Sequence, residues 1–144
     1  MKIPPEFSNQ AFEAAFKRSS VIKTKQHLSS GIEKDKFLII LNKCTHDEET
    51  FVFLSTTQLE FYERNPHFLK DCLKIEANKL EFFPRDTIIN CREVQTVQRS
   101  DLKKRYQEGL LKFEGELLKE MMDEIDRIVA SSRFLSPYQK NIIL

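Results

Sequence analysis

Two groups of side chains in the sequence have the chemistry that a phosphate group requires. Lys34 and Lys36 lie in the polar segment SSGIEKDK, directly before an apolar run, and Ser55, Thr56 and Thr57 end the next apolar run. In an antiparallel pair of strands, the start of one strand lies beside the end of its neighbour. We therefore expect the lysines to approach the hydroxyls, with ammonium groups to neutralise a phosphate and hydroxyls to bond its oxygens.

A histidine near the same segment is a candidate for proton transfer. His27 ends a strand-like run just before SSGIEKDK, and Lys25 precedes it by two residues on the same predicted face. An imidazole changes its protonation state near neutral pH, as a general acid or base must. His46 and His67 fall in predicted turns and loops, where we expect exposed side chains without a catalytic role.

Several common types of site are missing from the sequence. The chain has three glycines and no glycine-rich phosphate loop, and no spacing of Cys and His is typical of a metal site. The three cysteines are widely spaced, and we expect Cys44 and Cys91 to be buried, reduced thiols in strands. We therefore predict no metal and no cofactor.

The composition is typical of a single globular domain. The chain has 144 residues, of which 40% are hydrophobic and 31% charged, with twelve Phe and no Trp. The net charge of +1 means that any binding of nucleic acid depends on a local cationic patch. No apolar run approaches the roughly 18 residues that span a bilayer, and MKIPPEFSNQ lacks an apolar signal core, so we expect a cytoplasmic protein with no membrane partner.

The apolar pattern predicts a helix, a set of short strands and then further helices. The helix covers about residues 8–18, with Ser8 as its N-cap. About five strands follow within residues 20–97, one of them the continuous apolar run Phe37–Lys43 after the SSGIEKDK loop.

The remaining chain, about residues 100–143, is predicted to be helical. SDLKKRYQE begins a short polar helix at Ser100, and EGELLKEMMDEIDRIVASS at 114–132 has the apolar spacing of a long amphipathic helix. Ser136 followed by Pro137 is typical of the start of a last short helix.

Four segments, in order and spacing, resemble the MazF/PemK-type toxins of bacterial toxin–antitoxin systems, from about Lys23 to Ser132. The segments are GIEKDKFLIIL, FLSTTQ, RDTIINCREVQTVQRSDL and GELLKEMMDEIDRIVASS. The resemblance implies an α+β, mainly β fold: an SH3-like small barrel of the MazF/CcdB type with an N-terminal helix and C-terminal amphipathic helices. It also implies a homodimer, a cognate antitoxin protein as partner and metal-independent cleavage of single-stranded RNA.

The resemblance also assigns roles to individual residues. The family's catalytic arginine, which precedes a proline, falls on Lys36 before Phe37, and its threonine falls on Ser55 or Thr56. Lysine holds a phosphate but lacks the bidentate fork of arginine. The predicted catalytic residues are Lys36, Ser55, Thr56 and His27, and the predicted RNA-binding residues are Lys25, Lys34, Thr57, Phe61, Tyr62 and Arg85.

Alternatives stay open for several of these residues and for the function. Phe61, Tyr62 and Phe68 lie in a predicted long loop after the third strand, where aromatic rings either stack on bases or pack beneath the loop. Arg85, Asp86 and Arg92 border either an RNA groove or a dimer interface. The missing Arg-Pro pair also fits a non-catalytic module that binds RNA or protein. A toxin that acts on gyrase is a third hypothesis, because one fold carries several activities.

Overall fold

The computed structural model describes residues 5–27 and 33–144, with the backbone alone at residues 5, 6, 8, 26, 27, 33 and 34. The strands are β1 (Ser20–His27), β2 (Glu33–Ile40), β3 (Glu49–Thr56), β4 (Cys72–Ile75), β5 (Thr87–Gln98) and β6 (Leu111–Glu116). The helices are α1 (Pro5–Ala15), α2 (Glu60–Arg64), the 3₁₀ helix η1 (Pro66–Asp71), α3 (Arg99–Gln107), α4 (Lys119–Ser131) and α5 (Pro137–Ile143).

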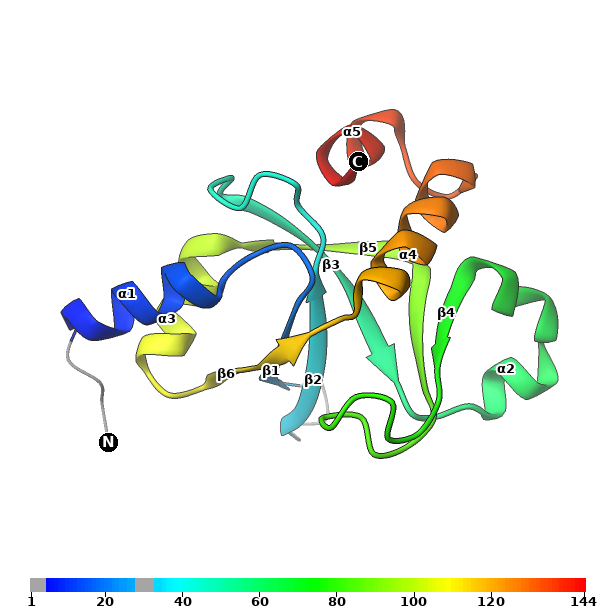
Figure 1. The fold of residues 1–144 in the computed structure, drawn as a ribbon, viewed down its shortest axis with the longest axis horizontal. Helices are drawn as coiled ribbons and strands as arrows, with labels where there is room; N and C mark the ends of the chain where they lie inside the picture. Colours follow the sequence, from blue (N-terminus) through cyan, green and yellow to red (C-terminus); the bar gives the residue numbers. More distant parts are fainter. Residues whose placement is uncertain (1–4, 28–32) are drawn as a thin grey trace.

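All six strands belong to one antiparallel sheet with the order β4-β5-β3-β2-β1-β6. The sheet is open, and β4 and β6 are its edges. Figure 1 shows α1 and α3 side by side near β6 and α4 near the β4–β5 end. The predicted α+β, mainly β class is confirmed, whereas the closed small barrel stays a prediction.

The sheet buries apolar side chains on both faces. Along β2 and the residue that follows it, Ile39 and Leu41 belong to a core cluster with α4, while Leu38 and Ile40 belong to a second cluster with α1 and α3. Successive side chains of a strand point to opposite faces, so burial on both sides explains the continuous apolar run. Complete burial of one such side chain contributes roughly 1.5–3 kcal/mol.

Helix α1 covers the second cluster through Phe12, which is fully buried and stacks on Phe16 with 5.0 Å between ring centroids. The helix extends over Pro5–Ala15 rather than 8–18, so Ser8 lies inside it and is not its cap. Proline fits the first helical turn because its missing N–H has no partner to lose there.

Strand β6 is the main difference from the sequence prediction, which places every strand before residue 98. It pairs with β1, with Ile22 opposite Phe113 and Thr24 opposite Leu111, and α4 begins only at Lys119. The six residues of β6 do alternate between apolar and charged. Six residues of alternation are too few to predict a strand where the apolar spacing of a helix follows directly.

Strand β2 begins four residues before the predicted apolar run. Charged residues extend it because they pair with β1, with Thr24 opposite Lys36 and Lys25 opposite Asp35. Lys36 therefore lies within a strand and not in a loop. Cys44 is exposed after the end of β2, which corrects its predicted burial, whereas Cys91 is buried as predicted.

The last two helices form as predicted, except that α4 begins at Lys119 rather than at residue 114. The apolar side of α4 is buried through five residues, and α5 begins with a capping box in which Ser136 Oγ accepts from Gln139 N at 3.1 Å. No helix in the described part of the chain is long and apolar enough to cross a membrane.

Candidate functional site

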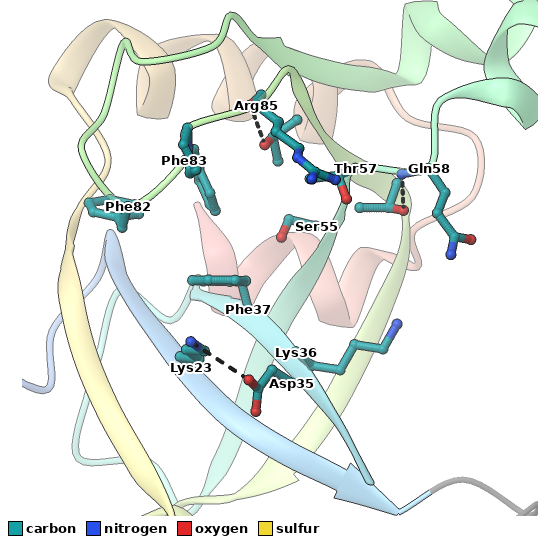
Figure 2. Close-up of a pocket in the computed structure, with 13 residues that line it drawn as sticks. Lys23, Asp35, Lys36, Phe37, Ser55, Thr57, Gln58, Phe82, Phe83 and Arg85 are labelled. Carbon is teal, nitrogen blue, oxygen red and sulfur yellow. Dashed lines mark hydrogen bonds and ion pairs between the residues drawn. The ribbon is translucent and has the colours of Figure 1, made fainter. Parts of the chain in front are cut away.

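A pocket of about 450 Å³ opens where β2 and β3 separate (Figure 2). The two strands pair from Ile40–Val52 to Leu38–Leu54, and no pairing continues towards the start of β2. The segment before β5 completes the wall. This β2–β3 pocket is lined by Lys23, Asp35, Lys36, Phe37, Ser55, Thr56, Thr57, Gln58, Phe82, Phe83, Pro84, Arg85 and Thr87.

The inner part of the β2–β3 pocket combines aromatic rings with a hydroxyl group. Phe37 packs edge-on against Phe83, with 5.3 Å between the ring centroids. Figure 2 shows Ser55 between the ring of Phe37 and the side chain of Arg85, while Lys36 points away from that ring. Adjacent residues of a strand face opposite sides, so Phe37 and Lys36 approach the pocket from different sides of β2.

The charges around the β2–β3 pocket are mainly positive. Lys23 and Asp35 form an ion pair of 3.6 Å, with 40% and 48% of the side chains exposed, and pairs this exposed contribute about 0–1 kcal/mol. Neither Lys36 nor Arg85 makes an ion pair or a side-chain hydrogen bond with the residues that the structure describes. The β2–β3 pocket is therefore a local cationic patch on a chain whose net charge is only +1.

The two predicted hydroxyls differ in their hydrogen bonds. Thr56 Oγ1 accepts from the backbone N–H of Gln58 at 3.0 Å, which holds it in the turn after β3. Ser55 is half-buried, and its Oγ makes no hydrogen bond with any described residue. Ser55 is consequently the hydroxyl with the greater capacity to bond a ligand in the β2–β3 pocket.

The structure brings together five of the residues predicted from the sequence, which are Lys36, Ser55, Thr56, Thr57 and Arg85. Lys25 lies on β1 two residues beyond Lys23 and does not line the pocket. His27 ends β1 with its Cα opposite that of Glu33, and Lys34 is opposite Gln26. The side chains of His27 and Lys34 lie outside the described residues.

The two predicted aromatic residues have different surroundings on α2. Phe61 is 53% exposed, whereas Tyr62 is 8% exposed and packs with Cys72 and Ile88. Burial raises the pKa of the Tyr62 hydroxyl to about 12. Phe61 therefore offers its ring to a partner, and Tyr62 has little surface for stacking.

Eight of the thirteen residues that line the β2–β3 pocket did not emerge as site residues from the sequence, among them Lys23, Phe82 and Phe83. Lys23 follows Val21 by two residues, so strand alternation places both on one face, and Phe82 and Phe83 directly precede Pro84 and Arg85. An aromatic pair beside a cation is a usable signal for such a pocket, but it needs the fold to bring β2 and β3 beside it.

Among the side chains that the structure describes, no three of His, Cys, Asp or Glu gather closely enough to hold a metal ion. No protein-family model matches the chain, and no curated protein matches it in sequence.

Proposed function

We propose that this protein binds single-stranded RNA in the β2–β3 pocket and cleaves it without a metal ion, as a toxin of the MazF/PemK type. One observation carries the proposal. The pocket combines two cations without partners among the described residues, Lys36 and Arg85, with the free hydroxyl of Ser55 and the ring of Phe37. A phosphodiester with an unpaired base requires this combination of positive charge, hydrogen-bond donors and aromatic surface.

Arg85 supplies the bidentate guanidinium group that Lys36 lacks. The resemblance gives the catalytic position to an arginine, and this chain has lysine there, which holds a phosphate only as a point charge. Arg85 reaches the same pocket from the segment before β5. We assign to its guanidinium the bidentate contact with two phosphate oxygens.

The reaction that fits these groups is attack of the RNA 2′-hydroxyl oxygen on the adjacent phosphorus, which breaks the P–O5′ bond. The 2′-hydroxyl loses its proton and the leaving 5′-oxygen gains one, so the products are a 2′,3′-cyclic phosphate and a 5′-hydroxyl end. Negative charge then grows on the phosphoryl oxygens, where Arg85, Lys36 and Ser55 stabilise it. His27 remains the candidate that moves the proton.

The same resemblance extends the proposal to the rest of the molecule. It supports a sheet related to the SH3-like small barrel, a homodimer and an antitoxin partner. These proposals rest on the four sequence segments and on the shared order of their elements. The proposed cytoplasmic location is supported instead by the free cysteines.

The test is incubation of the purified protein with single-stranded RNA in EDTA. We expect cleavage by the wild type and a loss of rate of about 10²–10³ in Arg85→Ala and in Ser55→Ala, because each removes a group that stabilises the developing charge. Arg133→Ala, which removes an exposed arginine outside the pocket, serves as the matched control. RNA that stays intact across several sequences would contradict cleavage.

A second candidate function is binding of RNA without cleavage. Among the described lining residues, Asp35 is the one carboxylate and no imidazole is present, and Asp35 is paired with Lys23. The described lining residues thus provide cations to bind a phosphate but no unpaired group to act as a general base. Binding of an oligonucleotide that Arg85→Ala weakens, together with intact RNA, would select this function.

A further inference from the structure

A second hollow, of about 300 Å³, lies between α2, η1, β5 and the segment after α4. It shares no lining residue with the β2–β3 pocket. We call it the Arg92 pocket, and its lining consists of Phe61, Tyr62, Phe68, Asn90, Arg92, Glu93 and Phe134.

Aromatic rings hold the guanidinium group of Arg92 in this pocket. Its central carbon lies 3.8 Å from the ring centroid of Phe68 and 4.3 Å from that of Phe134. Phe61 stacks on Phe68 with 5.2 Å between centroids and 19° between planes. The rings cover the faces of the guanidinium, so its N–H groups at the edge are what remains for a ligand.

The Arg92 guanidinium has a donor without a hydrogen-bond partner. Its Nε atom is buried and has no hydrogen-bond partner among the described residues. The nearest carboxylate oxygen, Asp71 Oδ2, is 3.9 Å away, which is an ion-pair distance but is too long for a hydrogen bond. Buried donors normally have a partner, and a planar carboxylate matches the fork of an arginine.

The rim of the Arg92 pocket is apolar and exposed. Phe61 and Phe134 are 53% and 47% exposed, although each packs against a neighbour in the pocket. Arginine and aromatic residues are enriched at the hot spots of protein–protein interfaces, and the Arg92 pocket combines both.

The charges beside Arg92 distinguish a protein from a nucleic acid as the ligand. Glu93 lines the pocket and Asp71 Oδ2 lies 3.9 Å from Arg92 Nε, so the pocket and its edge carry two carboxylates and one arginine. These carboxylates repel a polyanion, because a nucleic acid brings several phosphates close to each of them. A peptide that brings a single carboxylate gains the Arg92 contact without that repeated repulsion.

We propose that the Arg92 pocket binds a segment of a partner protein that places a large apolar side chain against Phe61 and Phe134 and an adjacent carboxylate on Arg92. The proposal does not depend on the RNA function, because the two pockets share no residue.

The experiment is an NMR titration of the full chain with the blocked peptide acetyl-Gly-Asp-Phe-Gly-amide, observing the arginine Nε–H signals and the aromatic ring signals. We expect saturable shifts of the Arg92 and Phe61 signals. Replacement of Asp by Asn, or of Phe by Ala, in the peptide should weaken binding at least tenfold, because each removes one of the two matched contacts.

Protein variants distinguish binding in the Arg92 pocket from nonspecific binding elsewhere on the surface. Phe61→Ala and Phe134→Ala should weaken the peptide at least tenfold, and Phe7→Ala, which removes a ring 59% exposed on α1, should leave binding unchanged. Equal binding of the Asn peptide, no saturable shift with any peptide, or displacement of the peptide by a single-stranded oligonucleotide would each overturn the proposal.

Discussion

At the scale of single residues, Arg85 is the side chain that best tests the proposed binding of a phosphate in the β2–β3 pocket. It is exposed and makes no side-chain bond to the described residues. We predict that Arg85→Ala weakens binding of a non-cleavable single-stranded oligonucleotide about tenfold and lowers the slope of log K against log salt by about 0.7, as expected for one lost phosphate contact on a single strand. Fluorescence anisotropy at several salt concentrations measures both quantities.

Two further variants make this prediction specific. Arg85→Lys should keep the salt slope, because the charge remains, while losing the geometry of the fork. Arg133→Ala should leave the affinity unchanged. Equal affinities of Arg85→Ala and wild type would show that the oligonucleotide binds elsewhere.

The cysteines give a second prediction at this scale. Burial raises the pKa of the Cys72 and Cys91 thiols, so their reactive thiolate forms are suppressed at pH 8, whereas Cys44 is exposed. Brief treatment of the folded protein with iodoacetamide should therefore modify Cys44 alone, and denatured protein should be modified at all three. Mass spectrometry of the peptides checks this, and rapid labelling of Cys91 in the folded protein would contradict its burial.

Side-chain types allowed part of the candidate site to be predicted. Lys36 lies within β2, Ser55 near the end of β3 and Arg85 in the segment before β5, and the fold brings these three places together in one pocket. Lys23 and Phe82 come from segments far apart in the chain, and their meeting depends on strand pairing that no local pattern encodes.

At the scale of elements, β6 supports one wall of the β2–β3 pocket. A Cβ added at Gly115 would lie 2.7 Å from Cε1 of Phe82, and Gly115 has a φ of +155°. We predict that Gly115→Ala lowers the free energy of unfolding by about 1–3 kcal/mol, as overpacking does, and weakens oligonucleotide binding by displacing Phe82. Urea denaturation and anisotropy measure the two effects.

Gly109→Ala provides the control for backbone strain without a clash. Gly109 has a φ of +76°, and nothing lies within 4 Å of an added Cβ. Gly109→Ala should therefore lower the free energy of unfolding only through the strain of the left-handed backbone, by roughly 1–2 kcal/mol. Phe82→Ala should relieve the additional cost of Gly115→Ala in the double variant. Independent, additive effects of Gly115→Ala and Phe82→Ala would contradict the contact.

Elements with strong local signals were predictable, and elements defined by pairing were not. The capping box of α5 and the apolar side of α4 lie within their own segments. The charged beginning of β2 and the whole of β6 form because β1 offers its two edges to them, which is a tertiary effect.

At the scale of the whole molecule, the sheet joins two cores into one folding unit. Phe12 lies in the cluster beneath α1 and α3, and Ile125 lies in the cluster beneath α4. We predict that Phe12→Ala and Ile125→Ala, each costing about 2–5 kcal/mol, both shift one common unfolding transition. Circular dichroism and tyrosine fluorescence should give the same midpoint, and a separate early transition in either variant would contradict a single unit.

The place of β1 between β2 and β6 also has a consequence for how the chain is made. The end of β1 and the start of β6 are residues 27 and 111, so 84 residues must be synthesised before β1 receives its second neighbour. At about 5–20 residues per second this takes roughly 4–17 s on the ribosome. Throughout that interval β1 has an unpaired edge on the side that later pairs with β6, and such an edge is open to chaperones and to mispairing.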